Sequence, residues 1–171
     1  MSDTFLGWKT PTPEQFLARV DQLGDRLSLN VPPVFTLAQL AALPAGSLGH
    51  TLAEHFLKTG LQPLTSGPRR KQLHDAVHVL TGYGTDPVGE LEVQAFMLGA
   101  KFFPTHLFLA IALLHLADRQ RHPLGLSHGT LIQRMHQAYQ RGQRSSFDID
   151  RWQPERQWHL PLQTVQQMLH L

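Results

Sequence analysis

Two histidines and two carboxylates lie close together in the middle of the chain. His74 and His78 are four residues apart, so a helix at this position would place both imidazoles on one face, about one turn apart. At 3.6 residues per turn, Asp75 is rotated by about 60° from His78, and its carboxylate leans toward the same side. Glu90 follows a glycine-containing break at residues 82–84, in the first turn of the next expected helix. A fold-back at this break would bring Glu90 beside the histidines.

These four side chains predict a site for a divalent cation. Two neutral imidazoles and two carboxylates supply nitrogen and oxygen ligands and neutralise a charge of +2. We therefore take His74, Asp75, His78 and Glu90 as the candidate metal ligands and catalytic residues. Asp75 has an alternative role, orienting a histidine, because adjacent residues rarely both point at one ion. Zinc is the first choice of metal, and Fe, Mn, Co and Mg are compatible with the same ligand types.

The elements that must position this group are predicted to be helices. Apolar residues recur at helical spacing, Pro and Gly separate the segments, and convincing period-two alternation is absent. Thr36, Ser47 and Asp86 are typical N-cap residues, and Gly60 and Gly82 are typical helix stops. The expected helices begin near Thr12, Thr36, Ser47, Pro68, Asp86, Thr105, His128 and Pro161. We predict an all-α fold, a compact single domain over residues 1–171 with about six to eight helices.

Composition narrows the function classes. The 171 residues include no cysteine, which excludes disulfides and thiolate ligands. Charged residues make up only 16%, against about 25% in an ordinary domain, and the formal net charge is +2. Nucleic acid is therefore not an expected partner, whereas an apolar partner is. The amino terminus lacks the apolar run of a signal peptide, and the longest apolar stretch, residues 102–117, is shorter than the ~20 residues of a membrane span. We expect a protein of the cytoplasm.

The motif His74-Asp75-x-x-His78-x11-Glu90 resembles the signature of the coenzyme Q biosynthesis proteins of the fourth numbered type. Further similar segments are LPAGSLG (residues 43–49), Arg69 with Lys71, AYQRG (138–142) and Glu155-x-x-Trp158-x-x-Pro161-Leu162, so the likeness covers about residues 43–171. The chain departs from the family at Ala76-Val77, where a bulkier residue is common, and in a short segment between Gly60 and Arg69. It resembles a compact bacterial branch.

The resemblance implies an α-helical protein that binds a divalent metal and a polyprenyl lipid or quinone precursor. It also implies a peripheral position on the inner face of the bacterial plasma membrane, a homodimer, and contacts with other quinone-biosynthesis enzymes. The family's activity has been viewed in two ways. One is oxidative decarboxylation, in which the C1 carboxyl of a polyprenylated aromatic acid is exchanged for hydroxyl. The other is a noncatalytic, lipid-binding or scaffold role with a structural metal.

An isoprenoid chain needs an apolar channel, and the apolar helices after Asp86 are its candidate walls. We expect Met97, Phe102 and Phe108 to contact the lipid, Met97 because it shares a helix face with Glu90. For most apolar residues of these helices, packing in the core is the simpler explanation. Five arginines and no acidic residue occupy residues 119–144, a pattern that suits anionic headgroups or a solvated helix face. Tyr83 and Lys101 are further candidates near the metal.

Two further hypotheses, both for hydrolytic enzymes, fit the sequence less well. A zinc peptidase carries a glutamate as general base between its paired histidines, where this chain has the shorter Asp75. A phosphohydrolase with a His-Asp metal pair needs a further histidine and a further aspartate, and the nearby upstream histidines are His50 and His55.

Overall fold

The computed structural model describes residues 30–102 and 126–171 of the chain. They form α2 (Leu37–Ala41), α3 (Leu48–Thr59), α4 (Arg69–Gln72), α5 (His74–Thr81), α6 (Pro87–Ala100), α8 (His128–Arg144), the 3-10 turn η1 (Pro154–Arg156) and α9 (Leu162–Met168). In these ranges the only β contacts are two isolated bridges. The predicted all-α class is confirmed. The helices expected to begin near Thr12 and Thr105 lie outside the described residues.

Helix boundaries follow the local signals of the sequence. Thr36 forms a capping box with Gln39, and the Ser47 hydroxyl accepts the backbone N–H of His50. Asp86 accepts the first free N–H groups of α6, and Pro87 occupies the first turn of that helix, where it loses no hydrogen bond. Sequence reasoning placed these starts correctly because each depends only on residues within one turn.

The segment after Pro68 differs from expectation. One helical segment was predicted from Pro68 to Gly82, but Leu73 (φ −93°, ψ 0°) separates α4 from α5. The buried Gln72 supplies the tertiary cause. Its amide accepts the N–H of Val34 at 3.0 Å and donates to the carbonyls of Val31 and Gly67 at 3.0 and 3.2 Å. These bonds tie α4 to a segment forty residues away, which no helical periodicity encodes.

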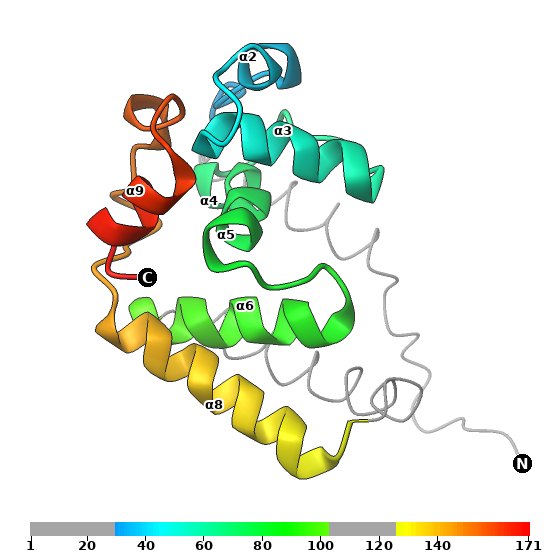
Figure 1. The fold of residues 1–171 in the computed structure, drawn as a ribbon, viewed down its shortest axis with the longest axis vertical. Helices are drawn as coiled ribbons and strands as arrows, with labels where there is room; N and C mark the ends of the chain where they lie inside the picture. The colour runs from blue at the N-terminus through cyan, green and yellow to red at the C-terminus, as the bar shows by residue number, and fades with distance from the viewer. Residues whose placement is uncertain (1–29, 103–125) are drawn as a thin grey trace, which may run out of the picture.

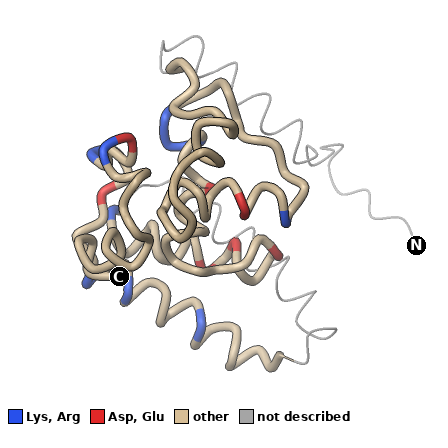
Figure 2. Tube along the Cα trace, turned by 45° about the horizontal axis from the view of Figure 1, so that its top comes forward, with Lys and Arg blue, Asp and Glu red and all other residues tan. Residues whose placement is uncertain are grey.

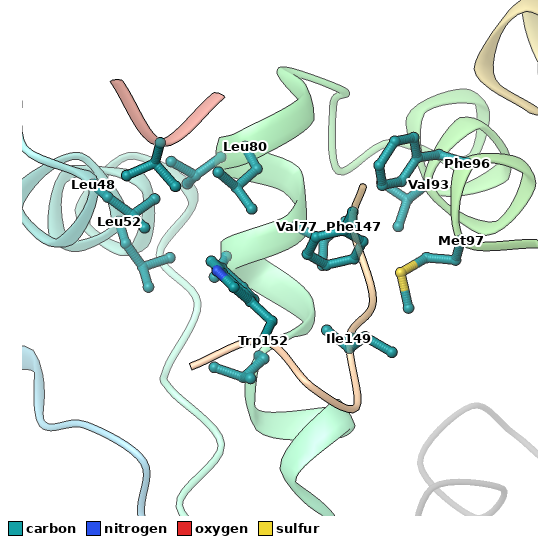
Figure 3. Close-up of a cluster of buried hydrophobic side chains, with 14 of the residues drawn as sticks. Leu48, Leu52, Val77, Leu80, Val93, Phe96, Met97, Phe147, Ile149 and Trp152 are labelled. Carbon is teal, nitrogen blue, oxygen red and sulfur yellow. The ribbon is translucent and has the colours of Figure 1, made fainter. Parts of the chain in front are cut away.

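The core lies where α5 is enclosed by α3, α6 and the C-terminal segment (Figure 1). Buried side chains from all four meet there, as Figure 3 shows for Leu48, Leu52, Val77, Leu80, Val93, Phe96, Met97, Phe147, Ile149 and Trp152. Burial of such side chains contributes about 1.5–3 kcal/mol each relative to exposure. Because α5 is enclosed on several sides, packing fixes the position of the helix and of the polar residues that it carries.

Helices α6 and α8 pack along their length and form one layer beneath α5 (Figure 1). Gly99 and Gly142 permit this close approach, since a Cβ on either would lie 2.1 Å from a backbone oxygen of the opposite helix. Only basic charged residues occur along α8 (Figure 2). Within residues 30–102 and 126–171, no helix is both long enough and apolar enough to cross a membrane.

Candidate metal centre

The corner between α5 and α6 brings three of the predicted ligands together. α5 ends at Gly82, whose φ of 75° lies in the left-handed region that glycine adopts without strain. After a short turn, α6 starts at the Asp86 cap, which places Glu90 in its first helical turn. The predicted fold-back is therefore present, and it directs Glu90 toward His74 and His78.

The potential ligand atoms of His74, His78 and Glu90 all lie within 4.8 Å of one another. Nε2 of His74 is 3.2 Å from one oxygen of Glu90, and Nε2 of His78 is 3.2 Å from the other. The two Nε2 atoms are also 3.2 Å apart, with the ring planes at 81°. Three donor atoms thus surround one small volume between the two helices.

A backbone carbonyl fixes the orientation of His78. Its Nδ1 lies 3.2 Å from the carbonyl oxygen of Tyr83, so Nδ1–H donates there and, in the neutral ring, the lone pair is on Nε2. Metal-binding histidines commonly have such a second partner on the other ring nitrogen. The His78 side chain is only 1% exposed, which keeps water from competing for this bond.

The three groups favour a proton or a metal ion among them. A lone pair on Nε2 of His78 would face a carboxylate oxygen and another ring nitrogen, and these acceptors repel unless a proton or a metal lies between them. Burial alone would raise the pKa of Glu90, but hydrogen bonds from His74 and His78 outweigh it and lower the pKa to about 2. Burial alone would lower the pKa of His78, but the Glu90 carboxylate and the Tyr83 carbonyl outweigh it and raise the pKa. Each of these two shifts favours the charged form of its group, so Glu90 and His78 stabilise one another's charge.

The separations also suit a divalent metal. Bonds of about 2.0–2.1 Å at tetrahedral angles place neighbouring donor atoms about 3.3–3.4 Å apart. The two Nε2 atoms are 3.2 Å apart, and each lies 3.2 Å from a different oxygen of Glu90. Two imidazoles and one carboxylate are the donor set of several catalytic zinc sites, in which a fourth position is left for water or substrate. His74 and Glu90 are about 30% exposed, at 31% and 28%, so the centre opens on their side and not on that of His78.

Asp75 has a different neighbour and is not one of the three converging residues. Its carboxylate lies 3.9 Å from Nε2 of His55, a residue of α3. The His55 ring is nearly parallel to that of His78, with centroids 6.1 Å apart, and burial lowers its pKa against the charge of Asp75. Asp75 and His55 therefore flank His78 behind the centre. This placement suits the alternative role considered for Asp75, orienting a histidine.

The hypothesis of a phosphohydrolase gains no support from the described part of the chain. It requires an upstream histidine to converge with His74 and Asp75, and no such group of ligand atoms is found in residues 30–102 and 126–171. His55 contacts Asp75 as described above, while His50 lies 3.6 Å from Glu54 of its own helix. His55 is the neighbour of the centre that sequence reasoning did not place, because nothing in α3 itself indicates which helix it packs against.

The three residues predicted to contact a lipid differ in their exposure in the structure. Met97 is 6% exposed and belongs to the main core cluster (Figure 3), which matches the simpler interpretation of the apolar stripe. Phe102 is 68% exposed, just beyond α6. Phe108 lies outside the described residues. Lys101, considered as a helper near the metal, instead pairs with Asp148 and Asp150 at 3.0 and 2.8 Å, which ties the end of α6 to the C-terminal segment.

Comparison with known proteins supports this architecture. No protein-family model matches the chain, and no curated protein matches it. Among solved structures, the fold is similar to a crystal structure described as a "putative ubiquinone biosynthesis protein" from Nostoc punctiforme PCC 73102. The TM-score is 0.65 at 22% sequence identity, and the match covers 88% of this chain and 73% of the other. The chain thus shares its helical fold with that cyanobacterial protein.

Proposed function

We propose that this chain is a metal-dependent protein of quinone biosynthesis, acting on a polyprenylated aromatic acid of the hydroxybenzoate type. The observation that carries the proposal is the convergence of His74, His78 and Glu90 on one small volume. The motif that contains these residues resembles that of the coenzyme Q proteins of the fourth numbered type. The fold similarity to a protein described as acting in ubiquinone biosynthesis supports the same direction.

The proposed reaction exchanges the C1 carboxyl group of the ring for hydroxyl. The bond between ring and carboxyl breaks and carbon dioxide leaves, while dioxygen supplies the new hydroxyl oxygen. The second oxygen atom leaves as water, which takes two electrons and two protons from an external reductant. A divalent metal at the centre would supply positive charge to a carboxylate or phenolate oxygen of the substrate.

The protein's own residues would hold this metal and orient the substrate toward it. His74, His78 and Glu90 are its ligands, with zinc the first choice, and the Tyr83 carbonyl keeps Nε2 of His78 free to bind. The substrate ring would approach from the side of His74 and Glu90, since the His78 side chain is enclosed. Asp75 adds negative charge behind the centre, beside His55.

The remaining parts of the proposal concern location and partners. A polyprenyl substrate favours a peripheral position on the inner face of the bacterial plasma membrane, where the prenyl chain is available. Phe102, exposed beyond α6, is consistent with an apolar partner. We also propose a homodimer and contacts with other quinone-biosynthesis enzymes, following the resemblance. Equilibrium sedimentation and binding to vesicles with and without a polyprenyl lipid test these points directly.

The decisive assay for the reaction uses metal-loaded protein, a prenylated hydroxybenzoate labelled with 13C in its carboxyl group, oxygen and a reductant. The proposal predicts labelled carbon dioxide and a hydroxylated product, both lost in Glu90→Gln. Arg134→Gln is the matched control, because Arg134 pairs with Glu92 on the same helix as Glu90 without contacting the centre. Absence of product from wild-type protein that holds stoichiometric metal would contradict the enzymatic role.

A noncatalytic role is the second candidate, and one observation favours it. The three ligands come from two consecutive helices, so a metal between them would join α5 to α6 and stabilise their corner. In that case the protein binds or presents a lipid without converting it. The result expected for this role is no product in the assay above, together with loss of helicity when a chelator removes the metal.

A further inference from the structure

Arg141 reaches from α8 to the corner that carries the metal centre. Its guanidinium donates to the carbonyl of Thr81 at 2.7 Å, and its central carbon lies 5.5 Å from the centroid of the Tyr83 ring. Thr81 is the last residue of α5, and Tyr83 follows Gly82. One side chain, sixty residues further along the chain, therefore contacts the residues on both sides of the turn.

One of the contacted residues, Tyr83, orients His78, and the other, Thr81, is linked to Tyr83. The Tyr83 carbonyl accepts the Nδ1–H of His78, and the Tyr83 N–H lies 3.5 Å from the Thr81 hydroxyl, which in turn donates to Val77 at 2.7 Å. Gly82 between them has a left-handed φ and no side chain to restrict it. Cation–π contact with the Tyr83 ring and a charge-assisted bond to Thr81 supply the restriction from outside the loop.

We propose that Arg141 is a positioning residue for the metal centre. It holds Tyr83 so that its carbonyl keeps His78 in the Nδ1–H tautomer, which leaves Nε2 free for the cation. The inference rests on the proposed metal-binding function, but the contacts of Arg141 with Thr81 and Tyr83 are present without a metal. It also assigns an internal use to an arginine of a segment whose charge pattern suited anionic headgroups.

Arg134 provides a matched comparison on the same helix. It lies seven residues before Arg141, about two turns away and on a similar face. It also joins α8 to the body of the protein, with hydrogen bonds of 2.8 and 2.6 Å to the buried Glu92. These hydrogen bonds go to Glu92 and not to Thr81 or Tyr83, and only charge interactions with Asp86 and Tyr83 link Arg134 to the α5–α6 corner. Loss of either arginine removes an anchor of α8, and only loss of Arg141 releases the turn that orients His78.

The test compares wild type with Arg141→Gln, Arg141→Lys and Arg134→Gln. Zn²⁺ affinity is measured by competition with a chromophoric chelator. The His78 tautomer is measured in metal-free protein, at a pH high enough for the ring to be neutral, by long-range 1H–15N NMR of the ring nitrogens. Because loss of a group that orients a metal ligand typically weakens affinity about 10–100-fold, we expect about a tenfold loss in Arg141→Gln. Arg134→Gln should stay within about twofold, and Arg141→Lys, which keeps the charge and one donor, should recover part of the loss.

Two outcomes would overturn the inference. One is an Arg141→Gln protein that binds Zn²⁺ as tightly as Arg134→Gln. The other is an unchanged His78 tautomer in metal-free Arg141→Gln. If Arg141→Gln does not fold, Arg141→Lys is compared with Arg134→Gln by the same two measurements. If wild-type protein binds no Zn²⁺, the proposed metal function fails, and the tautomer alone decides whether Arg141 positions His78.

Discussion

The close contact between α6 and α8 makes a sharp prediction about Gly142. A Cβ at this position would lie 2.1 Å from the carbonyl oxygen of Phe96 and 2.8 Å from the backbone nitrogen of Ala100. Both obstacles are backbone atoms of α6, and a Cβ essentially never comes within 3.0 Å of a nonbonded heavy atom. Gly142→Ala must therefore push the helices apart by about 1 Å, a shift that also displaces the neighbouring Arg141.

The expected cost can be worked out from two opposing effects. Overpacking a close contact costs about 1–3 kcal/mol, and the upper end applies because backbone cannot rotate out of the way. Alanine in place of glycine returns at most about 1 kcal/mol of helix propensity. The net loss in the free energy of unfolding is therefore about 2 kcal/mol, which in a chain of this size lowers Tm by about 4–8 °C.

Urea unfolding followed by circular dichroism measures this effect, with Gly129→Ala as the control. Gly129 is also in α8, but a Cβ there would meet only the Ser127 hydroxyl, at an ordinary 3.7 Å. Gly129→Ala should be neutral or stabilise by a few tenths of a kcal/mol. The reasoning is refuted if Gly142→Ala is as stable as wild type or gains as much as Gly129→Ala.

Three further predictions concern pH. In metal-free protein, the lowered pKa of Glu90 contributes stability above pH 4.5 that is lost as pH falls toward 2, at most about 3 kcal/mol, and acid unfolding of Glu90→Gln should lack this loss. His78 must release a proton to bind metal, and its pKa is raised above 6.5, so the Tm increase caused by added Zn²⁺ should grow as pH rises through and beyond 6.5; a flat profile would contradict this. Hydrogen bonds from Arg70 and Lys101 hold the pKa of Asp150 well below its usual range, so wild type should lose stability as the pH falls from 3.8 downward, and Arg70→Gln should lose less.

Much of the centre could be predicted because its geometry is local. The spacing of His74 and His78 fixes their shared face once α5 forms, and Asp86 starts the helix that carries Glu90. The turn between the helices is short enough that they must lie close together. The residues that form the site thus lie within about seventeen positions of one another. Helix geometry and capping chemistry were therefore sufficient to predict that they converge.

The parts that escaped prediction are tertiary. Gln72 interrupts the helix through bonds to a distant segment, His55 reaches Asp75 from α3, and Arg141 reaches Thr81 from α8. Each is an ordinary polar residue on a helix, and its own neighbourhood in sequence carries no signal of its partner. Met97 shows the same limit, since sharing a helix face with Glu90 did not decide whether it lines a site or fills the core.

The most direct measurement is the metal content of wild type, His78→Ala and Glu90→Ala after loading with Zn²⁺ or Co²⁺ and removal of excess ion. The account predicts one ion per chain in wild type, and for Co²⁺ an absorption spectrum typical of nitrogen and oxygen ligands. It predicts no bound ion in either variant, with circular dichroism showing that both remain helical. Stoichiometric metal retained by both variants would contradict the assignment of the centre to these residues.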